Sequence, residues 1–254
     1  MAPGSVLRSM RNLTPGAGHA RGSFVTTRWS LVLKARGASP EAKRALDELC
    51  RGYWYPLYCY ARSCGLQRAD AEDAIQGFLL CLLQKDFFGR AAQEEGRLRA
   101  FLKSSLQKHL VDKHRRAGAW KRGGRADFIP LDLTGAEERY LDEAADHRSP
   151  DQIYDRQWAL LFLDRVLDAL REHWMKKDKL ELFTALNPFL FSELVSENTR
   201  RLAAQFHLSE ANVKQNLHRM KTDFQTLFHR EVAETVQSEA DIAEEIAALR
   251  AALS

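Results

Sequence analysis

The chain has 254 residues, of which 45% are hydrophobic and 28% are charged, and its formal net charge is +4. This composition is typical of a soluble globular protein with one large or two small domains. The sequence has no apolar run of the ~20 residues that a membrane span needs, and no apolar stretch near its amino terminus predicts a secretory signal. Its four cysteines show no C-x-x-C spacing, so we expect buried free thiols rather than a disulfide framework.

The charged residues form blocks of alternating sign. Residues 91–125 hold ten basic and three acidic side chains, whereas residues 126–155 hold two basic and nine acidic ones. Residues 199–230 are basic again, with six basic and two acidic side chains. Residues 231–254 are acidic, with one basic and six acidic side chains. Two separated basic blocks predict contact with a polyanion at two places, although each block alone also fits a solvated helix face.

The first predicted elements lie before residue 66. Residues 1–25 show little apolar periodicity, which predicts a disordered basic tail; a transit peptide and an over-extended start are the alternatives. Ser39-Pro40 pairs an N-cap residue with a proline at the first helical position, so we expect a helix to begin there. This helix should pass through an aromatic stretch and stop at Gly65, which suits a C-cap.

Two further amphipathic helices are predicted before residue 117. The first starts near Asp70, where acidic side chains suit the positive end of the helix dipole. Its apolar residues recur at intervals of three and four, at Ala71, Ala74, Ile75, Phe78, Leu79 and Leu82. The second covers residues 97–116, with a core stripe of Leu98, Phe101, Leu102, Leu106, Leu110 and Val111.

Residues 117–149 interrupt the helical pattern. Gly118, Gly123, Gly124 and Pro130 exclude a long helix, and the charge changes sign midway. We expect an exposed linker without fixed structure over most of this span, and we take it as the boundary between two domains. Its acidic half could fold onto the basic residues between 115 and 125 and screen them from DNA.

Helical periodicity resumes after the linker. Ser149-Pro150 repeats the pairing of an N-cap residue with a proline at the start of a helix. The predicted helices cover about residues 150–174, 179–187, 199–206, 210–228 and 239–252. No strand-like alternation persists anywhere, so the predicted fold is all-α, with two helical domains joined by a flexible linker.

The strongest functional pattern is a helix-turn-helix between Thr199 and Lys221. The apolar positions of its two helices fall on one inner face, formed by Leu202, Ala203, Phe206, Val213, Leu217 and Met220. The turn His207-Leu208-Ser209 ends in an N-cap serine. Because His207 stands where such turns usually have glycine, we expect a left-handed backbone conformation at this histidine.

The outer face of the second helix carries amides and cations. Its polar residues are Asn212, Lys214, Gln215, Asn216, His218, Arg219 and Lys221. Amides suit the edges of DNA bases and cations suit phosphates, so this face predicts DNA binding. An ordinary helical hairpin with a solvated face is the alternative.

Neither a catalytic motif nor a metal-binding motif accompanies these patterns. The spacing of His109 and His114 does not place them on one helix face, and no cysteine lies near His207 or His218. The sequence contains no P-loop, nucleophile elbow or H-E-x-x-H motif. We therefore expect a protein that is not an enzyme and that uses no metal or other cofactor.

Ordered motifs along the whole chain are similar to those of one known family. They are Thr27-Arg-Trp-Ser-Leu-Val-Leu, Leu49-Cys-Arg-Gly-Tyr-Trp-Tyr-Pro-Leu-Tyr, Asp70-Ala-Glu-Asp-Ala-Ile-Gln-Gly-Phe, Gly96-Arg-Leu-Arg-Ala-Phe-Leu, Lys121-Arg-Gly-Gly and Ile129-Pro-Leu-Asp. With the helix-turn-helix and Ala233-Glu-Thr-Val, residues 26–254 resemble an extracytoplasmic-function (ECF) type sigma factor of bacterial RNA polymerase. The resemblance is closest to a subgroup from soil and aquatic bacteria such as planctomycetes.

The resemblance implies how the chain is divided. Residues 26–116 would be sigma region two, which binds core polymerase and reads the minus-ten promoter element. Residues 117–149 would be the linker, which in this family is thought to thread a polymerase channel. Residues 150–232 would be region four, whose helix-turn-helix reads the minus-thirty-five element, and residues 233–254 an acidic tail helix. Such a protein would act in the bacterial cytoplasm and would not bind a membrane.

The resemblance also implies two sets of site residues in region two. The clamp helices of the polymerase β′ subunit would be bound by Asp70, Glu72, Asp73 and Gln76; capping of the helix dipole is the alternative role of the acids. The minus-ten element would be bound by Gln107, Lys108, Lys113, Arg115 and Arg116; for each of these, a solvated helix face is the alternative. Lys108 stands where many members of the family have asparagine.

The expected partners are core RNA polymerase and promoter DNA. The apolar back of region four, with the helix at 153–174, would contact the polymerase β flap, and an anti-sigma protein, a kinase or the acidic tail could regulate the factor. The tail helix could instead simply complete a core. Two other functions stay open, namely a dimeric helix-turn-helix regulator that acts without polymerase, and a sigma-like fold that serves as a protein-interaction module.

Overall fold

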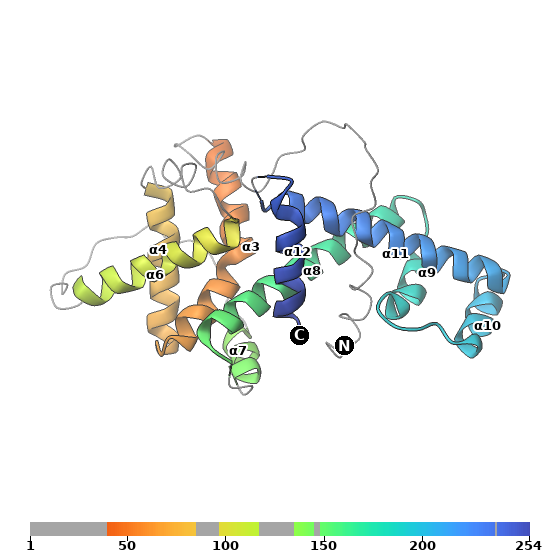
Figure 1. Ribbon diagram of the computed structural model, residues 1–254, viewed down its shortest axis with the longest axis horizontal. Coiled ribbons are helices and arrows are strands. Elements are labelled where there is room, and N and C mark those ends of the chain that lie inside the picture. Colours follow the sequence, from red (N-terminus) through yellow and green to blue (C-terminus); the bar gives the residue numbers. More distant parts are fainter. Residues whose placement is uncertain (1–39, 85–96, 117–134, 145–147, 237) are drawn as a thin grey trace. The chain divides into compact units, whose positions relative to one another are not determined.

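The computed structural model describes residues 40–84, 97–116, 135–144, 148–236 and 238–254 (Figure 1). The regular elements in these ranges are all helical, which confirms the all-α fold for the described residues. In chain order they are α3 (Pro40–Ser63), α4 (Arg68–Gln84), α6 (Leu98–Arg116), α7 (Ala136–Ala144), α8 (Pro150–Met175), α9 (Leu180–Leu186), the 3₁₀ turn η1 (Asn187–Phe189), α10 (Ser196–Gln205), α11 (Glu210–Ala233) and α12 (Asp241–Ala252). None of the described helices combines the length and the apolar character that would let it cross a membrane.

Three of the expected features fall largely or wholly beyond these ranges. The predicted amino-terminal tail of residues 1–25 and the motif that begins at Thr27 lie outside the described residues. Residues 117–134 and 145–147 of the predicted linker also lie outside them. The remaining predicted helices are present, with ends that differ from the predicted ones by a few residues.

The chain folds into two compact units. The amino-terminal unit contains the described residues up to Trp158 together with residues 233–241, and the carboxy-terminal unit contains Ala159–Val232 and Ile242–Ser254. The first turns of α8 therefore group with α3 and α6. The stacking of Trp158 on Tyr53 of α3, with ring centroids 4.6 Å apart, gives a physical reason for this grouping.

The core of the amino-terminal unit lies where α3, α4 and α6 pack together. The predicted apolar stripe of α4 is fully buried, from Ala71 to Leu82. In α6 the stripe is buried only as far as Leu106, because Leu110 is partly exposed and Val111 is 52% exposed. The prediction that Val111 belongs to the core is therefore wrong. The carboxy-terminal end of α6 therefore carries an apolar side chain that the fold does not cover.

The cysteines are less uniformly buried than we expected. Cys59 is buried in α3, whereas Cys64 is exposed and Cys81 is partly exposed; all three are free thiols. The side chain of Cys50 lies outside the described residues. Cys64 follows the last residue of α3, where the helix ends at Gly65 with a φ of +92°. This left-handed glycine confirms the predicted end of the helix.

Helix α7 lies within the span 117–149 that we expected to form a linker. We expected no fixed structure over most of that span; its residues 136–144 form a helix that packs on α3, and most of its other residues lie outside the described ranges. Ala136 and Tyr140 of α7 are buried, and Glu137 pairs with Arg62 of α3. Glu137 thus contacts α3, while most of the basic residues that the acidic half of the linker could screen lie outside the described residues.

The carboxy-terminal unit has a core drawn from α8 to α12. Val166, Leu170, Leu186, Val213, Met220 and Phe228 are each completely buried. Four apolar residues of the tail, Ile242, Ile246, Leu249 and Leu253, are buried as well. Because residues 242–254 belong to this unit, the tail helix completes its core, which was one of the two roles we considered for it.

Local sequence explains where α8 begins. The Ser149 Oγ accepts a hydrogen bond from the Gln152 N–H at 3.3 Å, and the Gln152 Oε1 accepts one from the Ser149 N–H at 2.9 Å. This reciprocal pair is a capping box, which satisfies two backbone donors at the helix start. With Pro150 at the first helical position, it confirms the predicted amino end of α8.

Candidate nucleic-acid interface

The turn between α10 and α11 has the geometry of a helix end closed by a left-handed residue. The Leu208 N–H donates to the Ala203 carbonyl at 2.9 Å, and the His207 N–H donates to that of Ala204 at 3.4 Å. These two bonds define a Schellman motif, in which the left-handed position is usually glycine. Here it is His207, with a φ of +53°, as predicted from the sequence.

The start of α11 is capped by Ser209. Its Oγ accepts a hydrogen bond from the Asn212 N–H at 3.2 Å, and its carbonyl accepts one from Val213 at 3.0 Å. The predicted N-cap is therefore confirmed. Together with the Schellman motif, this cap fixes the short turn that separates the two helices.

The apolar positions of the motif face inward, as the sequence predicted. Leu202, Val213, Leu217 and Met220 are all at most 7% exposed, while Ala203 and Phe206 are partly exposed. Burial of this stripe turns the opposite side of α11 to solvent. Of the seven predicted site residues on that side, Asn212, Lys214, Gln215, His218 and Arg219 are exposed.

Asn216 and Lys221 differ from the other five because they are only partly exposed. The Asn216 Nδ2 donates to the Asn212 carbonyl of its own helix at 2.8 Å. Burial lowers the pKa of the Lys221 ammonium, because desolvation disfavours its charged form. Both side chains lie at the border between the inner and outer faces. The face that can meet a ligand is therefore centred on Gln215 and His218.

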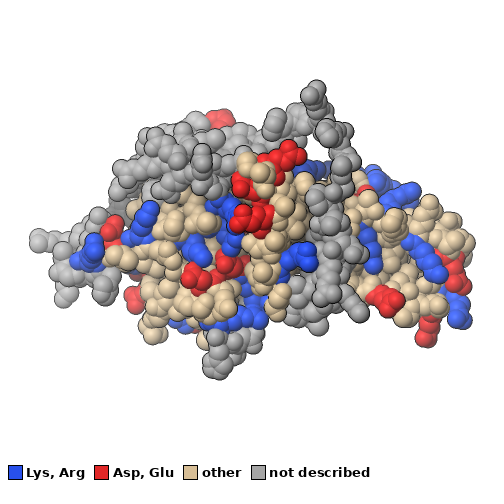
Figure 2. Space-filling model, in the orientation of Figure 1, with Lys and Arg blue, Asp and Glu red and all other residues tan. Residues whose placement is uncertain are grey.

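Charge is unevenly spread over the carboxy-terminal unit. On the face drawn in Figure 2, blue lysine and arginine atoms lie beside red acidic atoms over the region of α9, α10 and α11, whereas red atoms gather over α12. Exposed Arg200 and Arg201 on α10 add two cations that we did not include among the site residues. Positive charge on both helices of the motif favours an anionic ligand.

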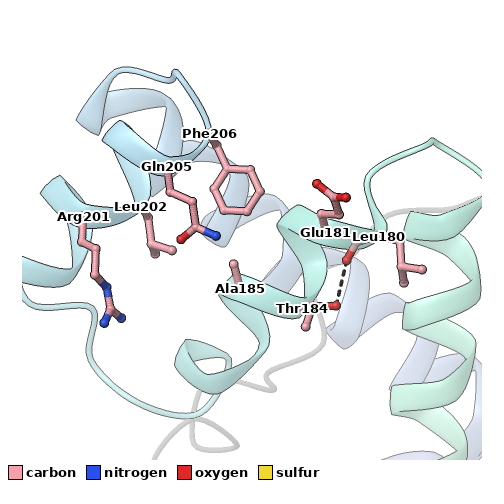
Figure 3. Close-up of a pocket in the computed structure, with 8 residues that line it drawn as sticks. All are labelled: Leu180, Glu181, Thr184, Ala185, Arg201, Leu202, Gln205 and Phe206. Atoms are coloured by element: carbon pink, nitrogen blue, oxygen red, sulfur yellow. Dashed lines mark hydrogen bonds between the residues drawn. The ribbon is translucent and has the colours of Figure 1, made fainter.

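A groove of about 500 Å³ lies between α9 and α10 (Figure 3). Leu180, Ala185, Leu202 and Phe206 provide its apolar surface, while Glu181, Thr184, Arg201 and Gln205 provide polar groups. The Thr184 hydroxyl donates to the Leu180 carbonyl at 2.9 Å, so this side chain is already engaged within α9. The groove is open and amphipathic, which suits a segment of a protein partner better than a small polar molecule.

Helix α6 presents the second predicted set of DNA-binding residues. Gln107, Lys108, Lys113 and Arg115 are exposed in its carboxy-terminal half, and the Arg116 side chain lies outside the described residues. The exposed Val111 lies among them. This half of α6 therefore offers an amide, several cations and an apolar side chain on its surface.

The cations in the first half of α6 are occupied within the amino-terminal unit. Arg99 forms an ion pair with Asp155 of α8, and the Lys103 Nζ lies 2.8 Å from the Asp151 Oδ1. The Lys103 ammonium also lies 5.7 Å from the centre of the Tyr154 ring. These pairs separate a paired half of α6 from the exposed half that holds the candidate site.

Gln107 has a partner that the sequence did not indicate. Its Nε2 donates to the hydroxyl of Tyr60 on α3 at 2.7 Å. The two residues are 47 positions apart, and no local pattern links them. Tyr60 is buried, so the amide of an exposed site residue is held by the core of the unit.

The predicted polymerase-binding acids lie at the start of α4. Asp70 and Asp73 are exposed, and Gln76 is partly exposed one turn later. Glu72 is partly exposed, and its Oε1 lies 2.9 Å from the Nε of Arg68 on the same helix. Asp70 and Asp73 therefore carry the carboxylates that are more accessible to a basic partner.

These residue sets are distributed over several helices. The four residues of α4 and the five of α6 lie on helices that pack on one another within the amino-terminal unit, whereas the seven of α11 belong to the carboxy-terminal unit. Within the described ranges, no cluster of three or more His, Cys, Asp or Glu side chains has an arrangement that could hold a metal ion.

Comparisons with known proteins do not assign this arrangement to a family. No family model, no curated protein and no solved structure matches the chain.

Proposed function

We propose that the protein is a sigma factor, which binds core RNA polymerase and directs it to promoters without catalysing a reaction of its own. The observation that carries the proposal is the helix-turn-helix of α10 and α11, whose capped turn, buried inner face and exposed amides and cations occur together. The proposal is further supported by the resemblance of ordered sequence motifs, and by the exposed acids of α4 and the exposed cations of α6.

In this proposal α11 lies in the major groove of the minus-thirty-five element. Gln215 and His218 would meet base edges, because they lie at the centre of the exposed face. Lys214 and Arg219 would contact phosphates on either side. Arg200 on α10 would add a contact to the DNA backbone, since the first helix of such a motif crosses it.

The exposed half of α6 would bind the opened minus-ten strand. Lys108, Lys113 and Arg115 can hold phosphates of a single strand, and Gln107 can hydrogen-bond to an unpaired base. The exposed Val111 would give apolar contact to a base or sugar. A role in strand binding would explain why this apolar residue is not covered by the fold.

Core polymerase would be bound at two places. Asp70 and Asp73 of α4 complement basic clamp helices, because opposite charges across an interface favour encounter and registration. The groove between α9 and α10 would take a segment of the β flap, whose apolar side chains would cover the partly exposed Leu180 and Phe206. The two contacts belong to different units of the chain.

Reconstitution with purified bacterial core polymerase tests this function. We expect saturable, one-to-one binding to core polymerase and transcription from a small subset of a genomic promoter library. The full-length chain without polymerase should bind the same DNA weakly. A dimer that recognises a two-fold symmetric site without polymerase would contradict the proposal and favour a conventional regulator. Polymerase-independent behaviour without salt-sensitive DNA binding would favour a protein-interaction module.

A further inference from the structure

The first two turns of α8 hold the amino-terminal half of α6. Arg99 of α6 forms an ion pair with Asp155, and the two side chains are 12% and 28% exposed. The Lys103 Nζ lies 2.8 Å from the Asp151 Oδ1 and 5.7 Å from the centre of the Tyr154 ring. The Tyr154 hydroxyl donates to the Arg99 carbonyl at 3.0 Å. Two cations and one backbone carbonyl of α6 are therefore bound by five consecutive positions of α8.

These α8 residues lie on one face of their helix. Positions 151, 154, 155 and 158 are spaced by three and four, so their side chains point in a similar direction. Trp158 stacks on Tyr53 of α3, with ring centroids 4.6 Å apart and 11° between the ring planes. Tyr154 and Trp158 are at most 1% exposed. Two buried rings thus fix this face of α8, and its two carboxylates reach α6.

A further contact to α6 comes from the segment that follows α11. The N–H of Leu98, the first residue of α6, donates to the Thr235 carbonyl at 3.2 Å. Both residues are at most 1% exposed. The first N–H groups of a helix have no partner within the helix, so this bond satisfies one of them. The start of α6 is therefore held by two segments that follow residue 148, in addition to its packing on α3 and α4.

The second half of α6 is much less covered. Every side chain that the structure describes between Gln107 and Arg115 is at least partly exposed. The hydrogen bond of Gln107 to Tyr60 and the packing of the His109 ring near Phe78, with ring centroids 5.8 Å apart, lie at the near end of this half. Because a helix of this length bends little, the direction of its exposed half follows from how its first half is held.

We propose that Asp151 and Asp155 are positioning residues, which hold α6 by its amino-terminal cations so that its exposed half can bind a single DNA strand. This inference rests on the proposed function, because it assumes that an opened promoter strand binds along α6. It goes beyond that function by giving the first turns of α8, which follow the predicted linker, a role in strand binding. In this role neither aspartate touches the strand, and each acts through its partner cation on α6.

The test reverses the charge at each position in the full chain. Asp155→Lys sets an ammonium against Arg99, and Asp151→Lys sets one against Lys103 at a site that is more exposed and tolerates substitution better. In the free chain we expect amide hydrogen exchange in residues 98–106 to become about tenfold faster, because α6 loses a partner and gains a like charge. With purified bacterial core polymerase, each variant should bind forked promoter DNA about fivefold more weakly.

The direction of the change separates positioning from a simple effect of charge. Both variants gain positive charge, which by itself favours DNA binding, so a weaker affinity reports on how α6 is held. Asp168→Lys is the matched control, because it makes the same charge change at an exposed site of α8 in the carboxy-terminal unit. It should leave hydrogen exchange in α6 and the affinity for forked DNA unchanged.

Exchanging the two partners should restore most of both measurements. Lys103→Asp combined with Asp151→Lys re-creates the ion pair with its charges exchanged. A fold that is merely destabilised would not be rescued by a second substitution, and neither would a chain in which Lys103 itself binds the strand. Rescue by this double variant therefore supports the positioning role specifically.

Unchanged or tighter binding of forked DNA by the charge-reversed variants would overturn the positioning role. Failure of the charge exchange to restore binding, or an equal loss in Asp168→Lys, would overturn it as well. In each of these cases the wild-type chain still binds core polymerase, and the proposed function stands. If the wild-type chain fails to bind core polymerase, the proposed function itself fails, and this inference fails with it.

Discussion

Arg62 of α3 and Glu137 of α7 form a bidentate ion pair, although they lie 75 positions apart in the sequence. The Arg62 Nε lies 3.0 Å from the Glu137 Oε2, and a second guanidinium nitrogen contacts the Oε1. The Tyr58 hydroxyl also donates to the Glu137 carboxylate, and the Arg62 guanidinium lies 5.0 Å from the centre of the Tyr140 ring. Because both charged side chains are at most 17% exposed, this pair is shielded from solvent and ties α7 to α3.

Replacing the carboxylate should loosen α7. In Glu137→Gln the Arg62 guanidinium loses its charged partner in a largely buried position, so we expect the free energy of unfolding to fall by about 1–2 kcal/mol. Urea denaturation of the full chain measures this change, and faster amide hydrogen exchange in residues 136–144 would locate it. Glu138→Gln alters an exposed neighbour and should change stability by less than about 0.5 kcal/mol. Equal effects of the two variants would contradict the anchoring role of Glu137.

The same pair predicts a dependence of stability on pH. The hydrogen bond from Arg62 is the main cause that holds the pKa of Glu137 below its ordinary value; burial opposes it, and Tyr58 supports it. A carboxylate with a lowered folded-state pKa adds stability above its unfolded pKa of about 4.3, and this contribution is lost as the pH falls through the folded-state value. The difference in the free energy of unfolding between wild type and Glu137→Gln should therefore have its largest value at pH 7 and shrink below about pH 4. A difference that stays constant down to pH 2 would contradict this assignment.

His207 should be replaceable by glycine with a gain in stability. Its φ of +53° is unfavourable for a residue with a Cβ, whereas glycine adopts this conformation without strain. Since glycine also loses more entropy on folding, we expect His207→Gly to raise the free energy of unfolding by at most about 1 kcal/mol. Thermal and urea denaturation give the sign of the change. Ala247→Gly, in the middle of α12, should instead lower stability by about 1 kcal/mol; a loss in both variants would argue against strain at His207.

The acidic start of α4 gives a prediction about polymerase binding. Asp73→Lys should weaken the affinity for core polymerase roughly tenfold or more, because it sets a cation against the basic clamp helices of the proposed partner. The helix content should not change, since Asp73 is exposed. Fluorescence anisotropy against labelled core polymerase provides the measurement. Glu239→Lys makes the same charge change at an exposed site elsewhere in the amino-terminal unit, and similar losses in both variants would refute a specific role for α4.

On the exposed face of α11, we expect some side chains to contact bases and others to contact phosphates. Gln215→Ala should change which promoter sequences are preferred, because the free-energy preference for the contacted base pair should fall by about 1–3 kcal/mol. Arg219→Ala should weaken binding to all sequences alike. It should also make the slope of log affinity against log salt concentration shallower by about one. Asn216→Ala should alter base preference less than Gln215→Ala, because the Asn216 amide is bonded to the Asn212 carbonyl. Selection from a randomised promoter library separates these outcomes, and identical profiles for Gln215→Ala and Arg219→Ala would refute the division.

Much of the fold could be predicted because its determinants are local. The capping box at Ser149, the N-cap at Ser209 and the left-handed residues at Gly65 and His207 each act through residues within about one helical turn. The inner face of the helix-turn-helix follows in the same way from the spacing of apolar residues along a helix. For the described residues, the sequence alone therefore determined the all-α class, the ends of several helices and the exposed face of α11.

The tertiary structure decided which side chains meet across the chain and which stay uncovered. Nothing near residue 137 indicates that its carboxylate pairs with Arg62, and nothing near residue 107 indicates that its amide is held by Tyr60. Val111 has the spacing of a core residue but remains exposed, because a helix buries only the part of its stripe that another element covers. Such contacts depend on how helices distant in sequence pack together, and helical periodicity carries no information about that choice.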